Sequence, residues 1–274
     1  MDICVLGPLR AAVDEINIVP TAQKPRSLLA LLAVYDDRVV PLEVIIAELW
    51  EEGPPPSVAT TTQTYILHLR RLIRSALGRL PGNGRPRNPM QVLRTEPGGY
   101  ALDKFGGLFD LAEHERLAAR GYDAMQAGDF NGAKESFEAA LALWRGAAFV
   151  DVVQGPRLSA QATLLEESRK VVLERRIQAD LHLGRHYEIL GELAGLTAEH
   201  PTDERLHAHY MVALYRAGRR AQALNVFERL QAILAEDLGM DPTPGLRHMH
   251  KCVLTADPVL ESAVSCARLM RAWP

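Results

Sequence analysis

Apolar residues recur at a spacing of three and four along residues 57–77, which read SVATTTQTYILHLRRLIRSAL. This spacing predicts one amphipathic helix with a single buried stripe. Three prolines at 54–56 end whatever precedes the segment, and Ser57 is placed to cap the first free N–H groups of the helix. The opposite face carries hydroxyls and amides first and arginines later, with no acid. Its polar residues are Thr60, Thr61, Gln63, Thr64, His68, Arg70, Arg71 and Arg74.

A face of this kind suits the major groove of DNA. Short donors and acceptors near the start of the helix can reach base edges, and guanidinium groups further along can hold phosphates. The alternative is a solvated helix face, but such faces ordinarily mix both signs of charge. We therefore interpret residues 57–77 as a recognition helix, with the side on which Gln63 lies left open.

The flanking patterns predict strands, helices and a hairpin. Residues 3–9 and the alternating stretch within 11–19 are typical of short strands, and residues 25–35 and 41–50 have helical spacing. A solvated loop with Arg79, Arg85 and Arg87 follows over residues 78–89. Residues 91–95 and 100–103 then form a hairpin around Pro97-Gly-Gly. This order is that of a winged helix with an N-terminal sheet.

The charge of the chain is unevenly distributed. The whole chain has a net charge of −3, which by itself argues weakly against nucleic acid. Residues 57–104, however, hold eight Lys/Arg and two Asp/Glu, whereas the segments on both sides are acidic. Because a local basic patch sets the attraction to phosphate, this distribution supports DNA binding by the recognition helix.

Beyond residue 105 the pattern is helical, with many Ala and Leu residues. Gly184-Arg185 recurs as Gly218-Arg219 after 34 residues, and Ala133, Phe137 and Ala140 have the spacing of Ala223, Phe227 and Leu230. A helix–turn–helix unit of 34 residues is the tetratricopeptide period. The match is degenerate, so an ordinary helical bundle remains the alternative. The predicted fold class is mostly α: an α+β winged helix-turn-helix domain followed by an all-α tetratricopeptide-like domain.

The run Leu69-Arg-Arg-Leu-Ile73 and the segment Arg94-Thr-Glu-Pro-Gly-Gly-Tyr-Ala-Leu102 resemble the effector domain of OmpR-type response regulators. The resemblance implies that the third helix reads the major groove and that the hairpin enters the minor groove. Tyr100 then packs the hairpin on the core. For His68 and Arg26 a solvated side chain is an equal or better alternative. The residues expected to face DNA are Thr60, Thr61, Thr64, His68, Arg70, Arg71, Arg74, Arg94, Thr95 and Arg26.

Two further segments, residues 201–224 and 234–246, complete a resemblance to the actinobacterial antibiotic regulatory proteins over about residues 2–254. It implies domains at 1–104 (winged helix) and 105–254 (bacterial transcriptional activation domain). Residues 255–274 lie outside the resemblance and are interpreted as a C-terminal tail. The resemblance further implies an activator of a secondary-metabolite gene cluster that binds double-stranded DNA with direct repeats near the promoter −35 element. Its partners would be RNA polymerase and further copies of itself on DNA. By analogy with OmpR-type proteins, residues 51–56 are a candidate polymerase contact, although a simple tight connection is the slightly favoured alternative.

Other functions find little support in the sequence. There is no run of about 18 apolar residues, no basic leader and no paired cysteine motif, so we expect a cytoplasmic protein. The histidines at 182/186, 200/207/209 and 248/250 lack the glutamate or cysteine spacing of metal sites, and no nucleophile motif or cofactor motif indicates an enzyme. The remaining alternative is a helical-repeat adaptor whose winged helix contacts protein instead of DNA.

Overall fold

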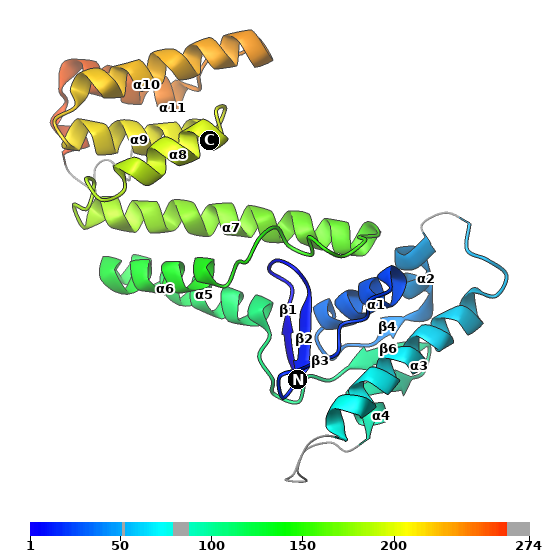
Figure 1. Ribbon diagram of the computed structural model, residues 1–274. Coiled ribbons are helices and arrows are strands. Elements are labelled where there is room, and N and C mark those ends of the chain that lie inside the picture. Colours follow the sequence, from blue (N-terminus) through cyan, green and yellow to red (C-terminus); the bar gives the residue numbers. More distant parts are fainter. Residues whose placement is uncertain (51–52, 79–87, 262–274) are drawn as a thin grey trace. The chain divides into compact units, whose positions relative to one another are not determined.

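The computed structural model describes residues 1–50, 53–78 and 88–261 (Figure 1). The arginines of the predicted loop at 79–87, the first two residues of the candidate polymerase contact and most of the predicted tail lie outside these residues. The chain divides into two compact units. The first comprises Met1–Ala118 with Ala139–Lys170, and the second comprises Ala119–Glu138 with Val171–Pro274. The first unit extends well beyond residue 104, so the predicted domain boundary at that residue stays a prediction.

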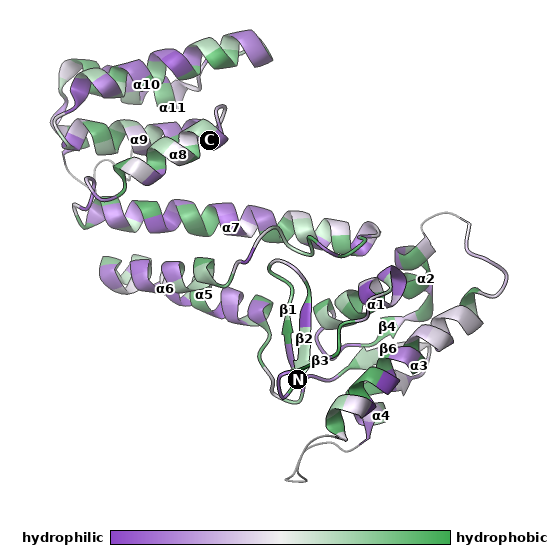
Figure 2. Cartoon of the chain, in the orientation of Figure 1, coloured by the Kyte–Doolittle hydropathy of each residue, from purple (hydrophilic) through white to green (hydrophobic). Residues whose placement is uncertain are grey.

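The first unit contains the predicted winged helix. Its elements in order are β1 (Asp2–Cys4), β2 (Arg10–Val13), β3 (Ile16–Asn17), α1 (Gln23–Val34), β4 (Val40–Pro41), α2 (Leu42–Trp50), α3 (Val58–Leu77), α4 (Pro89–Val92), β5 (Leu93–Glu96) and β6 (Gly99–Leu102). One antiparallel sheet has the order β1-β2-β3 and the other the order β4-β6-β5. Helix α1 is the central helix, because six successive residues from Leu28 to Ala33 are at most 1% exposed. In Figure 2, α2 is largely green, the colour of hydrophobic residues.

Two details of this unit add to the predicted elements. The turn that precedes the strand at Ile16 is formed by Asp14 and Glu15, whose φ angles are 45° and 69°, and a separate strand, β2, lies before it. The predicted loop ends in a helical turn, α4, which Asn88 caps through its side chain. The hairpin is confirmed. Glu96 pairs with Gly99 across a two-residue turn, and Gly98 takes a φ of +81° that favours glycine.

Two buried acids attach later segments to the winged helix within the first unit. Asp110, at the start of α5 (Asp110–Ala127), accepts hydrogen bonds from the backbone N–H groups of Val5 and Leu6. Glu48 of α2 accepts from the N–H groups of Gly155, Arg157 and Leu158, which surround the start of α7 (Pro156–His182). Both side chains thus supply acceptors to backbone N–H groups of the interior, two of them in the first turn of α7, where a helix leaves its N–H groups without a helical partner.

Gly155 lies so close to α2 that only glycine fits. A Cβ atom there would stand 2.2 Å from the backbone oxygen of Glu48. The approach lets the Glu48 carboxylate reach the start of α7, where the helix dipole also favours a negative charge. The winged helix and the segment around residue 155 therefore share one hydrophobic core, to which Phe149 and Leu158 contribute fully buried side chains.

The second unit consists of helices. They are the second half of α5, most of α6 (Phe130–Ala142), the second half of α7, α8 (Leu190–Glu199), α9 (Glu204–Arg216), α10 (Arg220–Ile233) and α11 (Pro244–Thr255). A π-helical turn, Leu234–Leu238, continues α10. Helix α9 packs against α8, α10 and α11, and eight of its thirteen residues are buried. Figure 1 shows α8 to α11 grouped together.

The positions of the predicted repeat are those of tetratricopeptide-like packing. Ala133, Phe137, Ala223 and Leu230 are all fully buried. The ring of Phe137 lies against Gly121 of α5, where a Cβ atom would stand only 2.4 Å from the ring. Gly184 and Gly218 both adopt a φ of +74°, so the two glycines 34 residues apart end α7 and α9 in the same way. The predicted fold class is confirmed.

Residues 255–261 of the predicted tail lie within the described structure. Pro258–Leu260 forms a 3-10 turn, Leu260 is fully buried, and its carbonyl accepts a hydrogen bond from Arg216 Nε at 2.8 Å. The first residues of the segment 255–274 therefore belong to the core of the second unit. In the described part of the chain no helix is long and apolar enough to cross a membrane.

Three of the histidines considered above as metal ligands pack against or among other side chains of the protein. His182 stacks on Phe130 with ring centroids 4.1 Å apart, and His250 stacks on Phe227 at 3.9 Å. His209 is 2% exposed, and its Nδ1 atom has no hydrogen-bond partner in the structure. Within the described residues, no three His, Cys, Asp or Glu side chains lie together as metal ligands would.

Burial lowers the pKa of His209 to about 4. In the unfolded chain this imidazole takes up a proton below about pH 6.5, whereas in the folded chain it stays neutral to about pH 4. We expect the free energy of unfolding to fall by about 2 kcal/mol between pH 7 and pH 5 through this group. Urea unfolding of wild type and of His209→Phe, followed by circular dichroism at both pH values, measures it. A parallel fall in the variant contradicts the prediction, and the exposed His200→Phe serves as control.

Candidate nucleic-acid interface

Helix α3 begins after the three prolines, as its sequence predicts. Ser57, however, does not cap it through its side chain, since its φ and ψ of −89° and 13° lie outside the extended region of a usual cap. The hydroxyls of Thr61 and Thr64 donate instead to the carbonyl oxygens of Ser57 and Thr60, four residues back. The outward surface at the start of α3 therefore consists of methyl groups and of hydroxyl oxygens that can still accept.

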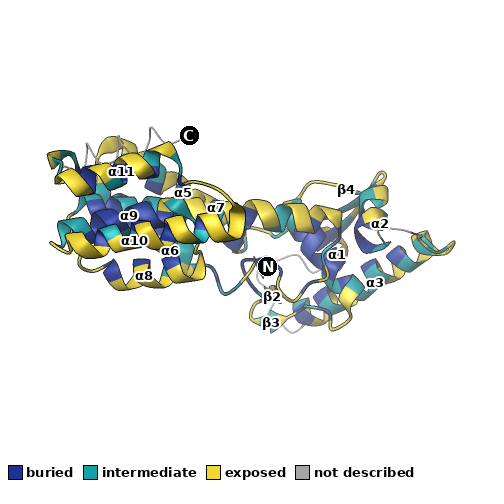
Figure 3. Ribbon diagram, turned by 90° about the horizontal axis from the view of Figure 1, so that it is seen from above, coloured by how far each residue is buried: buried dark blue, intermediate teal, exposed yellow. Residues whose placement is uncertain are grey.

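One side of α3 is buried and the other is open (Figure 3). The buried side chains are Thr62, Ile66, Leu69, Arg70, Ile73 and Ala76. The exposed side forms a stripe at a spacing of three and four, which we call the reading stripe. It comprises Thr60, Gln63, Thr64, Leu67, Arg71 and Arg74. The first half of the stripe, up to Leu67, carries no charge, and the second half has the guanidinium groups of Arg71 and Arg74. The change from uncharged to positively charged side chains that the sequence predicts is therefore present.

Four of the predicted helix residues lie on the reading stripe, namely Thr60, Thr64, Arg71 and Arg74. Thr61 and His68 lie beside it and are half-buried. Gln63, left open by the sequence, also belongs to the stripe. Leu67 was missed, although its position midway between Thr60 and Arg74 could have indicated it. Among the described residues, no acid pairs with Arg71 or Arg74, so both charges are available to a ligand.

Arg70 is a correction to the prediction. Its side chain is only 8% exposed and lies on the buried side of α3. Nε and Nη2 donate to the carbonyl oxygen of Leu93 at 3.0 and 2.8 Å, and Nη2 also donates to Thr95 Oγ1 at 2.7 Å. The guanidinium therefore fastens α3 to β5, the first strand of the hairpin, and does not face DNA.

Replacing Arg70 by methionine removes these three hydrogen bonds and leaves the buried carbonyl of Leu93 unpaired. We expect the free energy of unfolding to fall by about 2 kcal/mol, whereas the exposed neighbour Arg71→Met leaves it nearly unchanged. Thermal unfolding of the two variants beside wild type measures the difference. Equal melting temperatures of the two variants contradict this role for Arg70.

The surroundings of Arg94 in the hairpin also differ from the prediction. Arg94 is surrounded by three carboxylates, with Asp37 at 2.7 Å, Glu96 at 3.1 Å and Asp103 at 3.2 Å. The hydrogen bonds to Asp37 and Glu96 raise the pKa of Arg94. Its positive charge is compensated within the protein, so Arg94 is not placed to hold a phosphate. Thr95 is exposed beside it and accepts the hydrogen bond from Arg70.

Two other predicted residues have partners within the first unit. Arg26 donates to the carbonyl of Pro20 at 3.0 Å and forms an ion pair with Asp151 at 3.2 Å, so its phosphate contact is not supported. Tyr100 lies in β6 opposite Thr95 of β5 and Val40 of β4, and packs against the core as expected. The reading stripe therefore carries the candidate interface.

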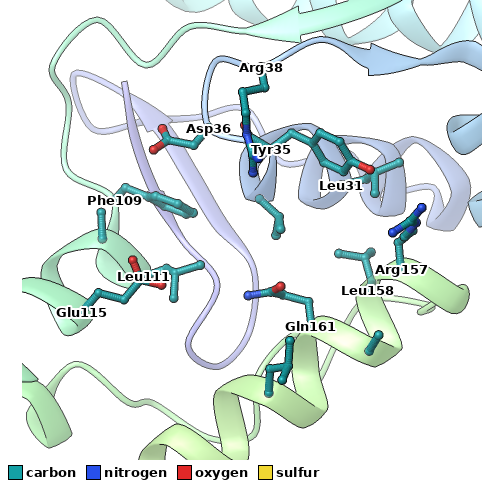
Figure 4. A pocket seen from close by; sticks show the side chains of 14 residues that line it. Leu31, Tyr35, Asp36, Arg38, Phe109, Leu111, Glu115, Arg157, Leu158 and Gln161 are labelled. Carbon is teal, nitrogen blue, oxygen red and sulfur yellow. The ribbon is translucent and has the colours of Figure 1, made fainter.

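A cavity of about 480 Å³ lies elsewhere in this unit, between the end of α1 and the first turns of α5 and α7 (Figure 4). Leu31, Phe109 and Leu111 form apolar parts of its wall, and charged side chains such as Asp36 stand at its edge. Asp36 forms an ion pair with Lys104. The cavity does not touch α3 or the hairpin, so it is separate from the candidate interface.

Comparison with known proteins agrees with this arrangement. Residues 109–254 match the bacterial transcriptional activator domain family. The regulatory protein DnrI of Streptomyces peucetius is 45% identical over 261 residues, which cover 95% of this chain and 94% of DnrI. The chain belongs to the antibiotic regulatory protein family of transcriptional activators.

This antibiotic regulatory protein is also 38% identical to the regulatory protein AfsR of Streptomyces coelicolor over 257 residues, which are 93% of this chain but 24% of AfsR. A solved structure of Mycobacterium tuberculosis EmbR, in complex with a low-affinity phosphopeptide, is 32% identical and superimposes with a TM-score of 0.85. The match covers 97% of this chain and 69% of the EmbR chain. The antibiotic regulatory protein thus has the same succession of winged helix and helical domain.

Proposed function

We propose that this transcriptional regulator is a sequence-specific DNA-binding activator of a secondary-metabolite gene cluster. The observation that carries the proposal is the reading stripe of α3, an exposed helix face with hydrogen-bonding groups at one end and, at the other, two arginines that pair with no acid among the described residues. A helix with such a face fits the major groove, where its early residues contact base edges and arginines hold phosphates.

The finer part of the proposal concerns the arrangement on DNA. The activator binds tandem direct repeats near the promoter −35 element, and copies of the chain lie head to tail on them. Head-to-tail contacts use two different surfaces of each copy, so the number of repeats bound sets the number of copies. Bound in this position, the activator recruits RNA polymerase, with residues 51–56 before α3 as a candidate contact.

Arg70, Arg94 and Arg26 bind partners within the protein, so fewer of the predicted residues are left to contact DNA. Direct contacts come from Thr60, Gln63, Thr64, Arg71 and Arg74, with Thr61, His68 and Thr95 at the edge of the interface. Arg70 acts indirectly, because it holds the hairpin on α3 and thereby sets the distance between the two DNA-binding elements. The adaptor alternative predicts instead a protein partner for the same face.

Fluorescence anisotropy tests the proposal with labelled duplexes that carry two repeats, one repeat or a scrambled sequence. The duplexes come from upstream of a neighbouring biosynthetic gene. The proposal predicts that two repeats bind more tightly than one, and both more tightly than the scrambled duplex. Equal and weak binding to all three duplexes contradicts it and favours the adaptor alternative. In vitro transcription from the same promoter then tests polymerase recruitment separately.

A further inference from the structure

Leu67 stands at the centre of the reading stripe and is 52% exposed. Within α3 it is the large apolar side chain that the described structure leaves most open to solvent. A single exposed leucine is ordinary on a protein surface. Here, however, it lies seven residues after Thr60 and seven before Arg74, so it occupies the middle of the stripe. In recognition helices that lie along the major groove, as in homeodomains, side chains of the middle turns also read base edges.

The major groove offers one apolar group to such a side chain, the C5-methyl group of thymine. The surroundings of Leu67 point to the same base pair. Gln63, one turn earlier on the stripe, has the amide that pairs with N6 and N7 of adenine in two hydrogen bonds. Thr64 has already donated its hydroxyl hydrogen to Thr60, so its methyl group and an accepting oxygen remain for DNA.

We infer that Leu67 contacts a thymine methyl group and selects an A·T pair in each repeat. The inference rests on the proposed DNA binding and adds a specific base preference to it. The contact removes the leucine side chain and the methyl group from water together, which is favourable in proportion to the apolar area buried. A cytosine at this position presents no methyl group and places an amino group against the leucine, so the wrong base leaves a donor unpaired.

Deoxyuridine tests the inference at the level of one methyl group, because it pairs as thymidine does and lacks only that group. A specific duplex is first selected from a random-sequence pool with wild-type protein. Each thymidine of one repeat is then replaced singly by deoxyuridine, and affinities are measured by anisotropy for wild type and Leu67→Ala. We expect one position at which deoxyuridine weakens wild-type binding about 4-fold. At that position Leu67→Ala binds both duplexes equally, as a double-mutant cycle requires for a direct contact.

Two further variants complete the design. Leu67→Met keeps an apolar side chain and should stay sensitive to deoxyuridine at the same position. Leu164→Ala removes a still more exposed leucine, on α7, and should retain the wild-type response. Alanine favours helix more than leucine does, so Leu67→Ala should fold normally.

Failure of the inference can be distinguished from failure of the proposed function. If wild type selects no sequence from the pool, the proposed DNA recognition is wrong. If wild type binds a selected duplex but no deoxyuridine position separates it from Leu67→Ala, the thymine contact is wrong. A loss of affinity in Leu67→Ala that is the same for all duplexes assigns Leu67 to a contact between protein copies and also overturns the inference.

Discussion

Replacing Glu48 by alanine should lower the free energy of unfolding of the first unit by about 3 kcal/mol. Glu48 is only 3% exposed, and its carboxylate accepts hydrogen bonds from Gly155, Arg157 and Leu158 at 2.8, 2.7 and 3.2 Å. Hydrogen bonds to a charged acceptor contribute more than neutral ones, and their loss leaves three backbone donors at the start of α7 without a partner. Denaturant unfolding followed by circular dichroism measures the change.

Glu43→Ala is the matched control, since Glu43 lies on the same helix but is exposed. It should change the free energy of unfolding by less than about 0.5 kcal/mol. A similar stability of the two variants contradicts the capping role of Glu48. A large loss in Glu48→Ala alone supports the view that the winged helix folds together with the segment around residue 155, and that a fragment ending at residue 104 lacks part of its own core.

The second large effect concerns DNA. Replacing Arg71 and Arg74 together by alanine should weaken binding to a specific duplex about 100-fold, or roughly 3 kcal/mol. Both side chains are exposed on the reading stripe and lack an acidic partner in the described structure, so the change removes two free positive charges from the interface. The melting temperature should stay that of wild type. Anisotropy and thermal unfolding of the same preparation measure the two quantities.

The control for this variant is Arg219→Ala with Arg229→Ala, which removes two exposed arginines from the region of α10. The net charge of the chain changes equally in both double variants, so a general effect of charge on DNA attraction is the same for both. Equal loss of affinity in the two variants argues against a specific role of α3.

The sequence predicted α3 and the hairpin well because their signals are local. Pro54 to Pro56, the apolar spacing and the Pro97-Gly98 turn depend on residues close together in the chain. The tetratricopeptide-like packing was predicted for a similar reason, since Gly184 and Gly218 report a repeated turn. The predicted side-chain cap at Ser57 is wrong: Ser57 is not in the extended conformation of a usual cap, and the N–H of Val58 donates to the carbonyl oxygen of Pro55.

The roles of the buried charged residues could not be predicted from the sequence. Arg70 is assigned to the polar face by its chemistry, yet its buried partner is the carbonyl of Leu93, 23 residues away. Glu48 and Asp110 likewise bind backbone N–H groups more than 100 residues away in the chain. Only the position of Arg70, four residues after Ile66 and three before Ile73, signalled its burial, because residues at these spacings share a helix face.

The dependence of DNA affinity on salt tests most directly the claim that the reading stripe holds DNA. Each phosphate neutralised by a side chain adds about one to the slope of log affinity against log salt concentration. We predict that Arg71→Ala/Arg74→Ala has a slope smaller than that of wild type by about 2 on the specific duplex, whereas the Arg219/Arg229 control keeps the wild-type slope. Identical slopes for wild type and the α3 double variant contradict the account.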